Sequence, residues 1–214
     1  MTPAVYPGDL WTVPRAWEGE RVYIIGGGPS VAHAGYSAIA RLHQTGRVIG
    51  INDAYRLRYC DALIFADRKW LQWPHTRRDL TSSSYGYLIG RVAREEANGD
   101  PPFHRLARDM MAGLSRNPQA LSGWDCGSNA INLAYHFTGG RPRDIVLLGF
   151  DMGGGNWHSR HLSPPRDAEY LARNVIPYFE RMAAELRAEG IRVINCSPGS
   201  ALTCFPIMSL ADVL

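Results

Sequence analysis

The clearest chemical signature in the sequence is a glycine-rich turn made of Gly26, Gly27, Gly28, Pro29 and Ser30. Glycines let a backbone approach a phosphate without a Cβ in the way. A helix that starts after the turn would offer N–H groups and its positive dipole end to an anion, and Pro29 suits the first helical position. The turn matches neither the GxGxxG nor the P-loop pattern. We interpret it as a phosphate-binding turn, with a plain tight turn as the alternative.

A second group of small and polar residues precedes a helix expected over residues 128–137. Its members are Ser122, Gly123, Gly127 and Ser128. Ser128 is a plausible N-cap, since a serine hydroxyl accepts a hydrogen bond from the first turn of a helix. The functional interpretation is a second helix start aimed at the ligand, and simple helix capping is the alternative.

Two histidines, His158 and His161, lie in a loop that follows three consecutive glycines. This pattern suggests a mobile loop that closes on a substrate, with one histidine as general acid or base. We expect His158, more than His161, to take a proton from an acceptor hydroxyl, and Asp151 could orient the ring. Asp151 could instead bind a ribose hydroxyl, hold a metal with the histidines or cap a turn, and the histidines could simply lie on the surface.

Short apolar segments alternate with segments of helical character, and this pattern predicts how these residues are positioned. Strands are expected at 21–25, 47–51, 61–65, 144–148 and 191–194, with 85–89 a further candidate. Helices are expected at 30–42, 128–137 and 167–188, the last kinked or divided by Pro177. The pattern predicts an α/β, Rossmann-like, mostly parallel sheet with helices on both faces. Ligands bind beyond the carboxyl ends of such strands, which adds Asn52, Asp67, Asn195 and Ser197 to the nucleotide site.

The chain is expected to form a single domain over residues 1–214. Residues 1–20 form an irregular arm packed by Trp11 and Trp17, and residues 82–120 form a variable insert. We also predict a short helix near Phe103 to Met111 and a C-terminal helix from Leu210 to Leu214.

The composition narrows the classes of protein to which the chain can belong. It has 214 residues, a formal net charge of +3 and no apolar run approaching the roughly 20 residues of a membrane helix. Nothing in the first residues resembles a signal peptide, and the four cysteines lack metal-binding spacing, so we expect reduced thiols and a cytoplasmic location. The cluster of basic and aromatic residues at 68–78 is more typical of a solvated helix face than of a nucleic-acid site.

Taken in order, these motifs resemble a known superfamily. They are the glycine turn, Asn52, Asp67, the Ser/Gly helix start, Gly149 to Met152, the histidine loop, and Asn195 to Ser200. The chain resembles the superfamily that joins bacterial lipooligosaccharide sialyltransferases with 6-hydroxymethylpterin diphosphokinase-like proteins of the DUF115 type, in the compact form that phages carry. The resemblance covers residue 22 to the C-terminus, apart from 82–120.

The resemblance implies that the glycine turn, Asn52 and the Ser/Gly helix start hold a cytidine nucleotide, and that a loop histidine acts as base. One hypothesis is therefore a glycosyltransferase that uses a nucleotide sugar as substrate and transfers the sugar to a hydroxyl acceptor. The sequence implies no definite cofactor for this reaction. A second is a diphosphokinase acting on a pterin-like hydroxymethyl group, with Mg²⁺ held by Asp67 and Asp151. A third is a nucleotide-binding module without catalysis. A homo-oligomer is compatible with all three.

Overall fold

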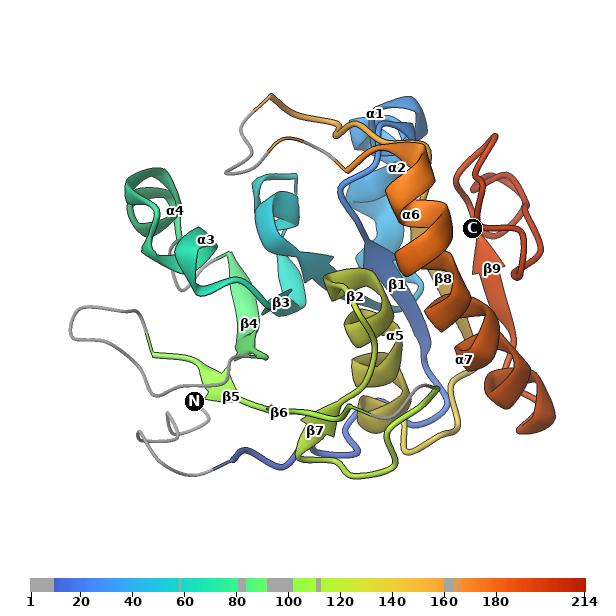
Figure 1. Cartoon of the computed structure of the whole chain (residues 1–214), viewed down its shortest axis with the longest axis horizontal. Coiled ribbons are helices and arrows are strands. Elements are labelled where there is room, and N and C mark those ends of the chain that lie inside the picture. The colour runs from blue at the N-terminus through green and yellow to red at the C-terminus, as the bar shows by residue number, and fades with distance from the viewer. Residues whose placement is uncertain are drawn as a thin grey trace.

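The computed structural model describes residues 10–57, 59–80, 84–91, 102–110, 113–159, 164 and 166–214. Its centre is a seven-stranded sheet with the order β5-β4-β3-β2-β1-β8-β9, in which every pair of neighbours is parallel (Figure 1). The strands are β1 (Arg21–Ile25), β2 (Arg47–Ile51), β3 (Cys60–Phe65), β4 (Tyr85–Gly90), β5 (His104–Arg105), β8 (Asp144–Leu148) and β9 (Val193–Asn195). The predicted α/β fold with a parallel sheet is confirmed, and so is the candidate strand at 85–89.

Both faces of the sheet are covered, as the continuous apolar strands require. In β1, Val22 and Ile24 point into one core, and Tyr23 and Ile25 point into the other. The helices that pack into the first core are α5 (Cys126–Phe137) and α7 (Ile176–Ala188). The second core is closed by α1 (Ser30–Ala34), α2 (Tyr36–Arg41), the short helix η1 (Leu42–Gln44) and the C-terminal segment.

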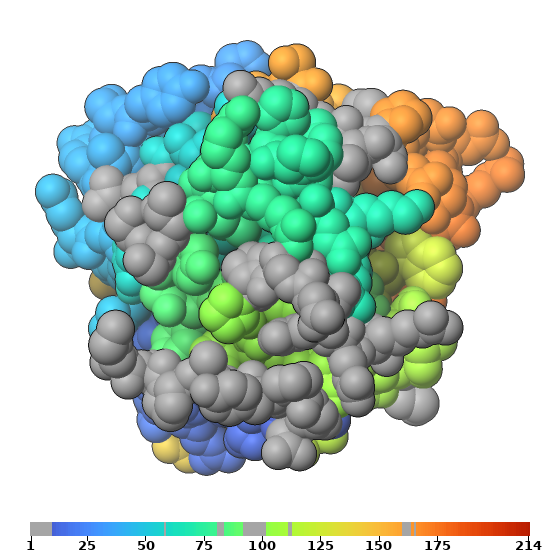
Figure 2. Space-filling model, turned by 90° about the vertical axis from the view of Figure 1, so that its left-hand side faces the viewer, coloured from blue at the N-terminus to red at the C-terminus, as the bar shows by residue number. Residues whose placement is uncertain are grey.

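A smaller apolar cluster lies toward the β4 side of the sheet, beneath α3 (Arg68–Gln72) and α4 (Pro74–Asp79). Figure 2 looks onto this side of the molecule, where α3 and α4 form much of the surface. Trp70 in α3 is 5% exposed, and its indole N–H donates to Asp53 in the short helix η2 (Asn52–Arg56) over 3.2 Å. The aromatic part of the 68–78 cluster is thus partly core, in line with the interpretation as a helix face.

Two predicted helices are wrong. The segment near Phe103 to Met111 forms β5 and β6 (Ala107–Arg108) instead, and β6 pairs with β7 (Ala120–Leu121); Met111 lies outside the described residues. An edge position beside β4, with the His104 ring stacked on Trp11 at 4.3 Å, outweighs the local helical pattern. Residues 210–214 form only turns, in which Val213 donates to the carbonyl of Leu210.

Other expectations hold with changed boundaries. The helix expected at 30–42 is interrupted by Gly35, whose φ of 77° no helical residue adopts. The helix expected at 167–188 is divided at Val175, just before Pro177, into α6 (Ala168–Asn174) and α7. Residues 10–20 run without helix or strand and bury Trp11 and Trp17, as predicted for the described part of the arm. No helix in the described parts of the chain has the length and apolar character needed to cross a bilayer.

Candidate functional site

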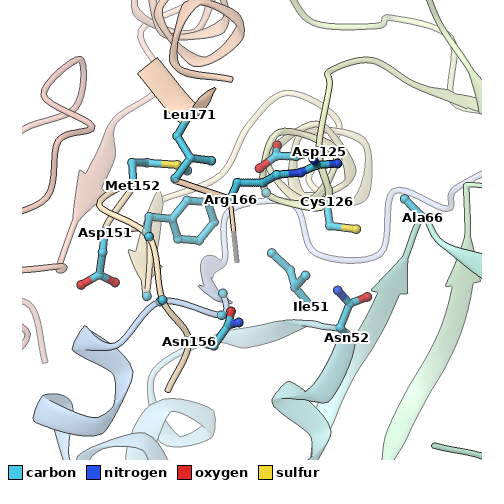
Figure 3. A pocket seen from close by; sticks show the side chains of 18 of the residues that line it. Ile51, Asn52, Ala66, Asp125, Cys126, Asp151, Met152, Asn156, Arg166 and Leu171 are labelled. Carbon is cyan, nitrogen blue, oxygen red and sulfur yellow. The ribbon is translucent and has the colours of Figure 1, made fainter. Parts of the chain in front are cut away.

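A cavity of about 450 Å³ opens beyond the carboxyl ends of β1, β2, β3, β4 and β8. It lies next to the boundary between β1 and β8, where the strand order reverses, which is where sheets of this kind bind ligands. The predicted residues on its wall are Gly26, Gly27, Gly28, Asn52, Asp67, Gly127 and Asp151. Figure 3 shows Asn52 and Asn156 pointing into the cavity, whereas Asp151 points away from its centre.

The glycine turn lies against the turn that follows β8. The N–H of Gly26 donates to Leu148, and the N–H of Gly28 donates to Gly149 over 2.9 Å. A Cβ at Gly26 would lie 2.7 Å from the carbonyl oxygen of Gly149, and one at Gly28 would overlap the Asp151 carboxylate. Close approach of two backbones therefore explains Gly26 and Gly28. A Cβ at Gly27 would meet only the end of a side chain, so Gly27 has space on its cavity side.

Asp151 occupies the place at the start of α1 that the sequence suggested for a phosphate. Its carboxylate accepts the backbone N–H of Ser30 at 3.1 Å and the Ser30 hydroxyl at 2.8 Å. Because a carboxylate already satisfies this N–H, a second anion at the same point would be repelled. Asp151 acts here as a cap across two loops. It does not orient His158, whose ring lies beside Asp53.

Asn52 follows β2 with a left-handed backbone, φ 50°, which asparagine tolerates better than most residues. Among the described residues its buried Oδ1 has no hydrogen-bond partner. A buried acceptor without a partner costs stability. Its position on the cavity wall makes it a natural acceptor for a donor group on a ligand.

Two arginines on the wall were missed in the sequence. Arg91 directly follows β4, and its backbone N–H donates to Phe65. The Nε of Arg91 is buried and has no partner among the described residues, and burial lowers the pKa of its guanidinium. Arg166 is exposed, and its guanidinium lies 4.5 Å from the centre of the Tyr170 ring. The rule about strand ends would have found Arg91 had the end of β4 been placed one residue later.

The N-cap of α5 is Asp125, and the prediction of Ser128 is wrong. The Asp125 carboxylate accepts the backbone N–H of Ser128 at 2.9 Å, while the Ser128 hydroxyl bonds back to Asp125. Asp125 and Cys126 both line the cavity. Burial raises the pKa of the Asp125 carboxyl and raises the pKa of the Cys126 thiol to about 12. An aspartate three residues before a serine at a helix start is the signal that would have identified this cap.

His158 is half-buried beside Asp53, with 3.8 Å between its Nε2 and Oδ2 of the aspartate. Its ring also packs edge-on against Trp157. It is not among the residues that line the cavity, although its neighbour Asn156 is. The carboxylate that faces this histidine is therefore Asp53, a buried residue that the sequence analysis did not single out. His161 lies outside the described residues.

Several predicted site residues lie behind the cavity wall. Ser122 is buried and bonds to Asn132 of α5 and to the carbonyl of Gly113. Asn195 and Ser197 hold the segment after β9, and the Ser197 hydroxyl accepts the N–H of Phe150. Those that do not line the cavity are Pro29, Ser30, Ser122, Gly123, Ser128, Asn195 and Ser197.

The carboxylates suggested for Mg²⁺ are both on the wall, but each already caps a helix or turn. Asp67 accepts the N–H of Lys69 at the start of α3, and Asp151 accepts that of Ser30. Within the described ranges, no three His, Cys, Asp or Glu side chains lie close enough together to hold a metal ion.

No protein-family model matches the chain, and neither does any curated protein sequence. A solved structure described as a MAf glycosyltransferase from Magnetospirillum magneticum AMB-1 is similar, with a TM-score of 0.65 at 15% sequence identity. The similarity covers 97% of this chain and 36% of that protein, so the chain corresponds to well under half of the longer protein. At this identity the comparison establishes a shared α/β fold.

Proposed function

We propose that the chain is a glycosyltransferase that binds a nucleotide sugar in the cavity and transfers the sugar to an acceptor hydroxyl. The observation that carries the proposal is the buried, unpartnered Nε of Arg91 on the wall of a glycine-lined cavity at the strand-order reversal. The charge of Asp125 acts on Arg91, but the arginine Nε still lacks a hydrogen-bond partner among the described residues, and the guanidinium fork matches the oxygens of a phosphate. The fold shared with a protein described as a glycosyltransferase supports the reaction class.

The donor phosphates are proposed to lie between Gly27 and Arg91, with Arg166 closing over them from the loop before α6. The position at Ser30 is unsuitable because Asp151 already fills it. Asn52 would accept a donor group from the ribose or the base. The resemblance to the sialyltransferase superfamily suggests a cytidine nucleotide as the first donor to test.

In the proposed reaction the acceptor oxygen forms a bond to the anomeric carbon of the sugar. The bond from that carbon to the phosphate oxygen breaks, and the nucleotide leaves with the electron pair. Arg91 and Arg166 would stabilise the negative charge that develops on the leaving phosphate.

Asp125 is the group on the cavity wall best suited to take the acceptor proton. Burial raises the pKa of its carboxyl, which makes the carboxylate a stronger base. His158 keeps the role only if the loop moves, since its ring lies behind the wall beside Asp53. His161 remains a candidate on sequence grounds alone.

The first experiment measures binding and turnover of nucleotides and nucleotide sugars by the parent protein. Thermal shift and calorimetry with CMP, UDP, GDP and their sugar conjugates should reveal a donor class, because a bound ligand raises the melting temperature. Release of the free nucleotide from a nucleotide sugar would support the transferase. Binding without turnover of any donor would leave the non-catalytic module. Transfer from ATP to a hydroxymethylpterin, abolished by EDTA, would overturn the proposal in favour of the diphosphokinase.

The second experiment identifies the base. Asp125→Asn preserves helix capping, because asparagine is as good an N-cap as aspartate. We expect it to cut kcat by roughly a hundredfold while donor binding stays nearly intact. His158→Ala and His161→Ala are measured in parallel. If Asp125→Asn turns over like the parent while one histidine variant loses kcat, the histidine loop supplies the base.

A further inference from the structure

An aromatic rim borders the cavity on the side of α6. It consists of Trp124, Tyr170 and Tyr178, together with the side chains of Arg108 and Arg166. Trp124 and Arg166 line the cavity itself. Trp124 is the most exposed of the described tryptophans, with 41% of its surface accessible to solvent. Trp124 therefore presents an aromatic face to solvent at the edge of the cavity.

The rim is held in place by contacts between its own members. The indole N–H of Trp124 donates to the Tyr170 hydroxyl over 3.2 Å, and the Trp124 and Tyr178 rings lie 5.9 Å apart. The guanidinium of Arg108 lies 5.6 Å from the Trp124 ring. An aromatic ring that is already fixed loses little conformational entropy when a ligand stacks on it.

The rim lies next to the proposed base. Trp124 directly precedes Asp125, the proposed base, and Arg91 at the end of β4 lies close enough to Asp125 for their charges to interact. Figure 3 shows the side chain of Arg166 extending across the cavity toward Asp125. A group bound on the rim would therefore lie next to the base, where the acceptor hydroxyl of the proposed reaction must be.

We propose that this rim is the acceptor subsite and that it takes the pyranose ring of a glycan. The inference rests on the proposed function, because it assigns the second substrate of the same reaction. A pyranose has an apolar face of C–H groups that suits an aromatic plane, and hydroxyls at its edge that suit donor groups such as guanidinium. Trp124 and Tyr178 supply the plane, and Arg108 and Arg166 supply the donors.

The test compares acceptor and donor kinetics in Trp124→Ala and Trp124→Phe, with lactose and methyl β-galactoside as acceptor probes. We expect Trp124→Ala to raise the acceptor KM about tenfold, and by a larger factor than it changes the donor Kd. Trp124→Phe should restore most of the acceptor affinity, since it keeps an aromatic face. Tyr36→Ala is the matched control, because Tyr36 is 73% exposed on α2 and lies outside the cavity wall.

A second measurement keeps the inference separable from the proposed function. Binding of lactose is followed directly by its effect on Trp124, as the fluorescence difference between the parent and Trp124→Phe, with and without nucleotide. Equal acceptor KM values in the parent and Trp124→Ala would overturn the inference, and so would a loss confined to donor binding, which would assign the ring to the nucleobase. A parent that binds nucleotide sugars but no glycan also overturns it while leaving the proposed function intact. A parent that binds lactose through Trp124 but no nucleotide sugar overturns the proposed function alone.

Discussion

Replacing Arg91 with methionine should separate ligand binding from stability. Arg91 carries a guanidinium on the cavity wall whose Nε is buried without a hydrogen-bond partner among the described residues. Methionine fills a similar volume and removes the charge. If Arg91 faces a ligand phosphate, Arg91→Met should bind nucleotide poorly while folding at least as well as the parent.

The magnitudes follow from the environment of the side chain. A hydrogen bond to a charged group contributes about 1.5–3 kcal/mol, which corresponds to a loss of roughly 10- to 150-fold in nucleotide affinity. In the absence of ligand, the desolvated guanidinium opposes folding, and burial accordingly lowers its pKa. Methionine removes this desolvation cost and breaks no hydrogen bond at Nε with any described residue, so the melting temperature of the free variant should not fall.

Calorimetry with the best nucleotide and thermal unfolding without ligand measure the two effects. Arg91→Lys keeps the charge but loses the planar fork, so its affinity should lie between those of the parent and the methionine variant. Arg166→Met serves as a comparison, since this arginine is exposed and should matter less. Unchanged affinity in Arg91→Met would refute the reasoning. A melting temperature lowered by several degrees would show that Arg91 is a structural partner instead.

Three further predictions test the framework around the site. Asp144→Ala should destabilise the fold by about 3–5 kcal/mol in chemical unfolding, because it strands the buried guanidinium of Arg21, which lies 2.5 Å from that carboxylate. Gly28→Ala should lower the melting temperature and disturb the cavity, since the added Cβ would overlap the Asp151 carboxylate; a variant as stable as the parent would contradict the packing of the two turns. The Cys126 thiol should resist alkylation at pH 8 and react faster as pH rises toward about 12, because burial raises its pKa. Peptide mapping after iodoacetamide treatment checks this. All four cysteines should react once the chain is unfolded, since none forms a disulfide.

The sheet was predictable because its central strands are short apolar segments, which are typical of strands buried on both faces. Once both faces of each strand are buried, the alternation with helices fixes a parallel sheet, and the rule about strand ends brings Gly27, Asn52 and Asp67 to one cavity. The segment around His104 was not predictable in the same way. Its secondary structure depends on an edge position beside β4 and on stacking against Trp11, which is more than ninety residues away in the sequence.

The partners of charged groups were also not predictable from the sequence, because they depend on contacts between distant segments. The sequence analysis could place Asp151 at a strand end. It could not show that this carboxylate accepts hydrogen bonds from Ser30, or that His158 lies beside Asp53. These pairings depend on how two loops from distant strands fold over one edge. Arg91 was missed for a smaller reason, since moving the end of one strand by a single residue changes which side chain faces the ligand.

The Asp151 carboxylate limits where the proposed anionic ligand could bind, because it already accepts the N–H of Ser30. A five-residue α1 whose first N–H already bonds to a carboxylate cannot also attract a phosphate, so the simple picture of a helix start cradling the ligand fails for this chain. The positive charge must come from elsewhere on the wall, and Arg91 and Arg166 are the arginines that line it among the described residues. The glycine turn contributes space at Gly27, while the N–H groups of Gly26 and Gly28 already donate within the protein. In the proposed complex, a phosphate held by Arg91 and Arg166 would lie away from Asp151 and toward α5. The sugar that it carries would then lie on the side of the cavity lined by Trp124 and Asp125.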